Sequence, residues 1–281
     1  MGTDDEPKMI QLGNTLTSSE KDALIALLTE FKEVFSWLYE DMPGIDTDIV
    51  QHCIIKDPTM KPVKQKLRRM KLEWTLKIKE EVEKQYNAGF LRMVKYLEWL
   101  ANVVLVPKKD VKVRMCVDFW DLNEASPKDD FPLPYIDILI DNAAEHALLS
   151  FMDGFLGYDQ IKMVLEDIEK TSFITPWGMY YYKVMPFGLK NAGATYQHAA
   201  TTLLHDLIHK EVEVYVDDMI VKSKDREGHI PALWKFFERI KFYKLRLNPK
   251  KCTFGVTFEK LLGLWKVRGG LKLVLTKLRQ L

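Results

Sequence analysis

The sequence contains too few cysteines to build a disulfide framework or a cysteine-rich zinc site. Cys53, Cys116 and Cys252 are odd in number and widely spaced, which predicts a reducing, intracellular setting. No apolar run approaches the ~20 residues that a membrane-spanning helix requires. The polar, acidic start MGTDDEPK is unlike a secretory signal or a transit peptide. What remains is a chain of 281 residues, 47% hydrophobic, which is long enough to bury a substantial core.

Net charge is also nearly absent, at +1, but the two signs are unevenly distributed. Residues 1–50 hold 11 acidic and 3 basic side chains, whereas the remainder holds 29 acidic and 38 basic ones. A polyanion would therefore be attracted to the second part and repelled by the first. A solvated surface explains the same charges, and charge alone favours that simpler interpretation.

Strands and helices are predicted to alternate without regular βαβ repeats, which is typical of an α+β fold with a mainly antiparallel sheet. Thr17 and Glu20 form a capping box before an amphipathic helix, which we interpret as a docked leader. The predicted helices cover residues 18–38, 73–88, 135–145, 192–209 and 229–244. The predicted strands cover residues 102–106, 113–117, 148–153, 171–175 and 180–185, a hairpin at 211–222 and a strand pair near 253–267.

The most informative segment is VEVYVDDMIV at residues 212–221, in which two apolar arms flank Asp217 and Asp218 at a turn. Aspartate is common in turns, so a plain hairpin explains this segment when it is taken alone. A second apolar strand, however, ends at Asp153. If the two strands are neighbours, Asp153 and Asp217 meet at one end of the sheet, where a cation is needed to offset their repulsion. Carboxylate oxygens of this kind suit Mg²⁺, which also binds substrate phosphates.

Several blocks of the sequence, in order and at matching spacing, resemble reverse transcriptases, and more narrowly those of plant gypsy-type long-terminal-repeat retrotransposon Pol polyproteins. The resemblance covers residues 50 to 265, and the blocks are VRMCVDFWDLNEASPKDDFPLP, SFMDGFLGYDQIKM, EKTSFITPWGMYYYKVMPFGLKNAGATYQ, YVDDMIVKS and LRLNPKKCTFG. It implies the fingers and palm of a right-hand polymerase, with a mainly antiparallel palm sheet packed on helices. It also implies an intracellular location, in the cytoplasm, a virus-like particle or the nucleus.

The resemblance implies a domain order along the chain. Residues 1–50 would be an acidic leader or linker with an amphipathic helix, and 51–147 the fingers with the start of the palm. Residues 148–265 would be the palm up to the primer grip, with a fingers insertion around 160–190. Residues 266–281 would be a truncated tail, so that the thumb and the ribonuclease H domain are absent. A chain without a thumb is expected to hold duplex weakly and with strong salt dependence.

The same resemblance assigns the catalytic carboxylates. Asp153, Asp217 and Asp218 would be catalytic, and two Mg²⁺ ions (or Mn²⁺) would be held by Asp153, Asp217 and the carbonyl of Gly154. Asp218 would act electrostatically, since adjacent residues of a strand point to opposite faces. In this arrangement two metal ions assist an in-line phosphoryl transfer.

The incoming dNTP would be bound by cations and by an aromatic group. The cations are Lys108, Lys109 and Arg114. The guanidinium group of Arg114 is suited to bidentate phosphate contacts. The ring of Tyr158 would exclude a ribose 2′-hydroxyl, although core packing is the simpler interpretation of a lone tyrosine. The loop beneath the base pair would contain Phe187 and Gly188.

Template and primer contacts are implied at several further positions, although a solvated surface role is the favoured interpretation of each individual lysine. These positions are Lys64, Lys66, Arg68, Arg69, Tyr215, Lys250 and Lys251, together with Leu262 and Gly263 in the segment that resembles a primer grip.

A few positions depart from the family pattern. Trp120 stands where arginine is usual, Val111 where glycine is usual, and Leu156 and Asp159 where serine and asparagine are usual. These departures suggest a decaying genomic copy.

Taken together, the carboxylates and the resemblance make an RNA-directed DNA polymerase the leading hypothesis. The alternatives are an inactive retrotransposon remnant that only binds nucleic acid, a polypeptide that is never productively expressed or is a structural relic, and an RNA-templated RNA polymerase, which Tyr158 disfavours.

Overall fold

The structure is a computed structural model that describes residues 9–107 and 113–257. The chain divides into two compact units, and each is described by itself. Unit 1 comprises Met1–Trp37, Pro132–Gly157 and Tyr196–Leu281, and unit 2 comprises Leu38–Phe131 and Tyr158–Thr195.

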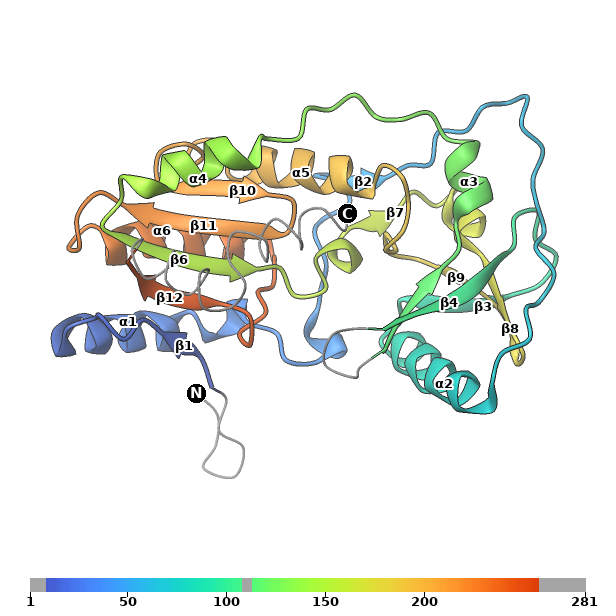
Figure 1. Cartoon of the computed structure of the whole chain (residues 1–281), viewed down its shortest axis with the longest axis horizontal. Helices are drawn as coiled ribbons and strands as arrows, with labels where there is room; N and C mark the ends of the chain where they lie inside the picture. Colours follow the sequence, from blue (N-terminus) through green and yellow to red (C-terminus); the bar gives the residue numbers. More distant parts are fainter. Residues whose placement is uncertain (1–8, 108–112, 258–281) are drawn as a thin grey trace. The chain divides into compact units, whose positions relative to one another are not determined.

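Unit 1 is built on a five-stranded, mainly antiparallel sheet (Figure 1). Its strand order is β1 (Gln11–Leu12), β12 (Thr253–Val256), β6 (Leu148–Asp153), β11 (Asp218–Ser223) and β10 (Val212–Tyr215). Only the β1–β12 pair is parallel. The central strand β6 is therefore hydrogen-bonded along both of its edges.

Strand β6 is covered on both faces, which explains its nearly continuous apolar sequence. Leu149 and Phe151 share a face with Ala143 of helix α4 (Ile136–Ala144). Ser150 points to the other face, where its Oγ lies 2.7 Å from Nε2 of His229 at the start of helix α6 (His229–Phe242). This alternation is the period of two expected of a strand.

The predicted leader helix is present as α1 (Ser18–Glu30), with the predicted Thr17–Glu20 capping box. It ends eight residues earlier than predicted, at a C-cap at Phe31, and a short 3-10 helix follows at Lys32–Val34. Phe31 then packs on Phe237 of α6, with ring centroids 5.6 Å apart. Helix α1 and Phe31 are therefore docked on unit 1, whereas the predicted 1–50 segment is divided between the units after Trp37.

Unit 2 contains a second five-stranded sheet, in which only the β4–β8 pair is parallel. Its order is β3 (Leu91–Val94), β9 (Gly178–Tyr182), β8 (Phe173–Thr175), β4 (Ala101–Pro107) and β5 (Val113–Val117). Helix α2 (Leu72–Asn87) buries Ile78 and Val82 beside this sheet. Unit 2 also contains helix α3 (Trp120–Glu124) and a small parallel pair formed by β2 (Gln51–His52) and β7 (Lys162–Met163).

The predicted elements and the observed ones agree for most of the chain. Helix α5 (Ala192–Leu203) ends six residues before the predicted end, and the division between the units falls inside it. The observed boundary after Phe131 differs from the expected one after residue 147, because α4 packs on β10 of unit 1. The second strand of the pair predicted near 253–267 lies outside the described residues. Among the helices that the structure describes, none combines the length and apolar character needed to cross a membrane.

Candidate active site

Strand pairing brings the predicted carboxylates to one end of the unit 1 sheet. Strand β11 runs antiparallel to β6, and Asp218 is the register partner of Asp153. Directly opposed residues of an antiparallel pair share a face, so these two carboxylates share one. The backbone N–H of Gly154 donates to the carbonyl of Asp217 at 3.0 Å. Asp153, Gly154, Asp217 and Asp218 are thus neighbours. Asp218, however, was expected on the opposite face of the strand, and it shares the face of Asp153, because β11 begins at Asp218 and Asp217 lies in the turn before it.

Asp217 occupies the two-residue turn between β10 and β11, and this turn carries backbone strain. Val216, the other turn residue, has φ of +53°, a conformation that a β-branched side chain rarely adopts. The amide side chain of Gln197 on α5 holds the turn, because its Oε1 accepts from the N–H of Val216 at 2.6 Å and its Nε2 donates to the carbonyl of Val214 at 3.3 Å. Gln197 is buried, and sequence reasoning did not identify it.

Two glycines allow the chain to pack closely around Asp217. A Cβ added at Gly157 would lie 2.8 Å from Cβ of Asp217, which is closer than real Cβ contacts allow. A Cβ added at Gly154 would lie 2.9 Å from Oη of Tyr196. Gly157, the second glycine of GFLGYDQ, is therefore required sterically beside the Asp217 carboxylate.

Lys251 contacts the first of the carboxylates. Its Nζ lies 2.7 Å from Oδ1 and 2.8 Å from Oδ2 of Asp153. Asp153 is only 5% exposed, so a partner of opposite charge stabilises its buried charge. The backbone N–H of Asn248 also donates to the carbonyl of Asp153, at 2.8 Å, which anchors the loop that carries Lys251.

The oxygen atoms at this end of the sheet are of the kind that binds divalent cations. They are hard oxygen atoms, from the carboxylates and from the carbonyl of Gly154. The ammonium group of Lys251 shows that a cation is already held against Asp153. Within residues 9–107 and 113–257, no group of three or more His, Cys, Asp or Glu side chains is gathered tightly enough to hold a metal ion. Filling such a site would require Lys251 to leave Asp153.

Three of the side chains predicted to bind the nucleotide are stacked on one another within unit 2. The ring of Tyr158 stacks on that of Phe187, with centroids 5.5 Å apart and an angle of 29° between the planes. Cζ of Arg114 lies 4.9 Å from the centroid of Phe187, a cation–π distance. Tyr158 and Phe187 are therefore partners of each other, and the stack carries a guanidinium group.

The loop after Phe187 is held by Asn123 of α3, which sequence reasoning also missed. Nδ2 of Asn123 donates to the carbonyl of Gly188 at 2.8 Å, and its Oδ1 accepts from the N–H of Lys190 at 2.8 Å. Gly188 has φ of +103°, a conformation that favours glycine. Asn123 belongs to the FWDLN block, where it could have been singled out.

Asp159, one of the departures from the family pattern, lies in unit 2, and the pKa of its carboxyl group is raised. Burial raises the pKa of its carboxyl to about 7, and the nearby charge of Glu81 adds to this effect. The positive charge of Arg114 acts in the opposite direction. Near neutral pH this position is therefore only partly charged.

The predicted template and primer residues are distributed over both units. In unit 2, Lys64, Lys66, Arg68 and Arg69 are exposed, and Arg68 pairs with Asp118 at 2.6 Å. In unit 1, Tyr215 is half-buried and is the register partner of Asp218, and Lys250 is exposed. Lys251 contacts Asp153. Lys108, Lys109, Val111, Leu262 and Gly263 lie outside the described residues.

Comparison with known proteins connects this geometry to a family. Residues 106–266, more than half of the chain, match the family described as reverse transcriptase (RNA-dependent DNA polymerase). The Pol polyprotein of transposon 297 from Drosophila melanogaster is 29% identical over 213 residues, covering 74% of this chain and 20% of that protein. The Pol polyprotein of transposon opus from the same organism is 28% identical over 257 residues, covering 90% of this chain and 25% of that protein.

A solved structure of a foamy viral protease-reverse transcriptase in complex with an RNA/DNA hybrid has the same fold. Its TM-score is 0.77 at 19% identity, over 85% of this chain and 32% of that one. The predicted α+β fold of fingers and palm is thus confirmed. The chain spans about a quarter or less of the transposon polyproteins and about a third of the viral chain. With the family match, the shared fold and the carboxylates at one sheet end all in agreement, this chain belongs to the reverse transcriptase (RNA-dependent DNA polymerase) family.

Proposed function

We propose that this chain is the polymerase core of an RNA-directed DNA polymerase, which adds dNTPs to the 3′ end of a primer on an RNA or DNA template. The observation that carries the proposal is the pairing of β6 with β11, which aligns Asp153 with Asp218 and bonds Gly154 to Asp217. This acidic end lies in a chain of the reverse transcriptase family. Retrotransposon relatives support an origin in a Pol polyprotein, and we further propose the gypsy class and a plant source from the resemblance of the sequence blocks.

Asp153, Asp217 and the carbonyl of Gly154 would hold divalent cations, for which we propose Mg²⁺. When bound, two such ions would activate the primer hydroxyl and offset charge on the leaving pyrophosphate. The contribution of the protein is to fix the carboxylates before the substrates arrive. Gln197 fixes the turn that carries Asp217, and the β6–β11 register fixes Asp153.

We assign the nucleotide to the stacked group of unit 2. Arg114 would contact the triphosphate, because a guanidinium group makes bidentate, charge-assisted hydrogen bonds to phosphate oxygens. The ring of Tyr158 is held in place by stacking on Phe187. A ring fixed in this way would leave no space for a ribose 2′-hydroxyl, which supports the choice of dNTPs.

We also propose that template and primer are bound through basic side chains, Lys64, Lys66, Arg69 and Lys250. These are exposed, as phosphate contacts require. Binding through them should weaken with salt, with a slope of about −0.7 to −0.9 per phosphate neutralised. The solved foamy viral enzyme, in complex with an RNA/DNA hybrid, supports a nucleic-acid partner.

The decisive experiment is extension of oligo(dT) on poly(rA) by the purified 281-residue chain with Mg²⁺, compared with Asp153→Asn and Asp217→Asn. We expect extension by the wild type and a loss of about 100-fold or more in both variants. Asp22→Asn, on the exposed side of α1, is the matched control and should extend normally. Salt-sensitive duplex binding without extension at any Mg²⁺ or Mn²⁺ concentration would instead identify an inactive remnant that only binds nucleic acid.

A further inference from the structure

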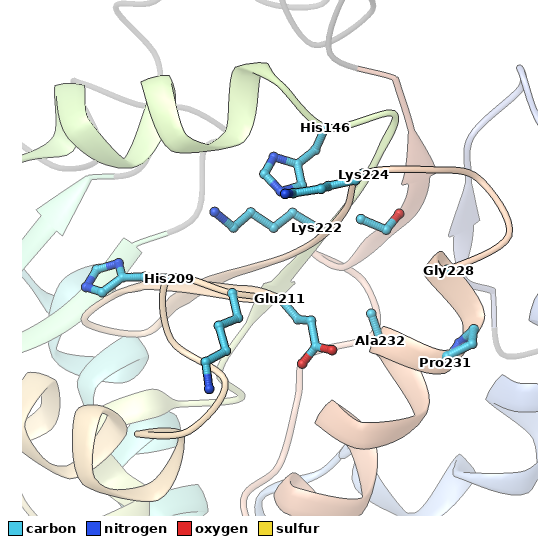
Figure 2. A pocket seen from close by; sticks show the side chains of 10 residues that line it. His146, His209, Glu211, Lys222, Lys224, Gly228, Pro231 and Ala232 are labelled. Carbon is cyan, nitrogen blue, oxygen red and sulfur yellow. The ribbon is translucent and has the colours of Figure 1, made fainter.

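A second polar site lies in unit 1, at the opposite end of the sheet from the carboxylates. A cavity of about 570 Å³ opens where β11 ends at Ser223 and β6 begins at Leu148 (Figure 2). Asp153 lies at the far end of β6, about 17 Å away at ~3.3 Å per residue. The cavity is therefore distinct from the proposed polymerase site. Its volume lies in the range typical of small-ligand sites, roughly 300–1,000 Å³.

The walls of this cavity are predominantly cationic. Lys210, Lys222 and Lys224 line it, and Glu211 is the one carboxylate among its lining residues. Glu211 is already paired with Lys235 of α6. Lys222 is buried and paired with Glu213 at 2.8 Å. Within the part of the chain that the structure describes, Lys210 and Lys224 have no ion-pair partner. Two ammonium groups at the cavity are therefore not engaged in a described ion pair.

A buried nitrogen also lacks a partner at this cavity. Nδ1 of His146 is buried and has no hydrogen-bond partner within residues 9–107 and 113–257. Figure 2 shows the His146 ring beside the side chain of Lys224, with Lys222 next to them. Burial is the first cause that lowers the pKa of His146, and the positive charges of Lys222 and Lys224 lower it further. The backbone of Asn142 and the negative charge of Glu145 raise the pKa and so act in the opposite direction. The two ammonium groups are the larger of the charges that act on the ring.

The start of the 14-residue helix α6 forms part of the wall, through Gly228, Pro231 and Ala232. The carboxylate of Asp225 accepts from the N–H of Gly228 at 2.6 Å, so this helix end already faces a negative charge. Pro231 has no N–H to donate. The positive charge at the cavity therefore comes from the lysine side chains.

We propose that this cavity, lined by His146, Lys210, Lys224 and the start of α6, is a binding site for a phosphate group. Phosphate matches the double positive charge and the ammonium donors, and the cavity leaves room for a larger group attached to the phosphate. The group could belong to a free phosphate ion or to the backbone of a nucleic-acid strand, which share this chemistry. The proposal does not depend on polymerase activity.

The test is equilibrium dialysis of the 281-residue chain with radiolabelled inorganic phosphate in low salt and EDTA, so that no metal-dependent site contributes. We expect saturable binding, weakened about tenfold or more in the Lys210→Gln/Lys224→Gln variant, because it removes two charge-assisted contacts. Lys84→Gln/Lys95→Gln changes the net charge equally at exposed positions of unit 2 and should bind as the wild type does. Circular dichroism of each variant verifies folding.

Absence of saturable binding, or an equal loss in both double variants, would overturn the proposal. A short oligo(dT) strand added as competitor distinguishes the two sources. If oligo(dT) displaces the phosphate from the wild type, and its own binding depends on Lys210 and Lys224, the natural ligand is a strand backbone. Saturable phosphate binding that oligo(dT) leaves unchanged identifies a free phosphate ion. Both results support a phosphate site.

Discussion

Lys251 donates hydrogen bonds from its ammonium group to both carboxylate oxygens of Asp153. Asp153 is almost completely buried, whereas the Lys251 side chain is 47% exposed and attached to a loop. The lysine is therefore the partner that has space to move away. Because a divalent cation would need the same oxygens, lysine and metal would compete for one carboxylate under the proposed function.

Replacing Lys251 by methionine should strengthen Mn²⁺ binding by about tenfold, because the competing ammonium charge is removed. In EDTA the same variant should unfold more easily, by about 1–2 kcal/mol, since a buried carboxylate loses its partner. Mn²⁺ electron paramagnetic resonance measures the first effect and thermal unfolding the second. Lys250→Met, at the exposed neighbouring position, is the control. Equal Mn²⁺ affinity in wild type and Lys251→Met would rule out competition.

Replacing Gln197 by leucine should leave the buried N–H of Val216 without its partner. We expect a loss of about 1–3 kcal/mol of stability and of about 10–100-fold in the rate of primer extension, because the strained turn that carries Asp217 is no longer fixed. Gln197→Glu keeps the accepting oxygen and should retain more activity. Denaturant unfolding and single-turnover extension provide the two measurements. Full activity of Gln197→Leu would show that the turn keeps its shape without this bond.

Replacing Gly157 by alanine should displace Asp217, because the new Cβ would lie only 2.8 Å from its Cβ. We expect the extension rate to fall by about 100-fold or less, as for a ~1 Å displacement of a reacting group, with weaker Mn²⁺ binding. Gly193→Ala is a matched control, since its Cβ would meet only Oη of Tyr158 at 3.6 Å, an ordinary contact. If both variants bind Mn²⁺ equally well, the close packing at Gly157 does not position the carboxylate.

Replacing Asp159 by asparagine should raise the free energy of unfolding, and this gain over the wild type should be larger at pH 8 than at pH 5. The pKa of Asp159 is about 7 in the folded chain against an ordinary value of 3.8. Between these values the folded state binds more protons than the unfolded state, so the wild type loses stability as pH rises from about 4 to 7. At pH 8 the asparagine variant should therefore have a free energy of unfolding about 1–3 kcal/mol higher than the wild type. Urea unfolding at both pH values measures it, and a gain that is larger at pH 5 would contradict the assignment.

The sequence alone was sufficient to predict that Asp153 lies beside Asp217 and Asp218, because Asp153 and Asp217 each follow an apolar run and the pairing of two strands brings the runs together. The β4–β5 hairpin and helix α2 were predicted for similar reasons, since their apolar positions recur at regular intervals. Strand β3, with the sequence LRMV, was missed because four residues are too few to show a period.

Other features depend on contacts between distant segments, which periodicity does not reveal. Gln197 and Asp217 are 20 positions apart in the sequence, and Lys251 is nearly a hundred residues from Asp153. Lys251 was expected at the template because a lysine in a basic run carries no signal for one particular carboxylate. The cationic cavity draws its residues from three separate segments, so sequence reasoning did not find it.

The position of β6 between β11 and β12 has a consequence for synthesis on the ribosome. Both strands that flank β6 are translated after it, and β12 is nearly the last described element. Every segment of unit 2, in contrast, has been translated by Thr195. The nascent chain can therefore complete its second unit first, while β6 waits with both edges unpaired. An emerging chain that stalls between Thr195 and Asp218, before β11 has been made, would expose both edges to other chains, and aggregation during translation is the expected result.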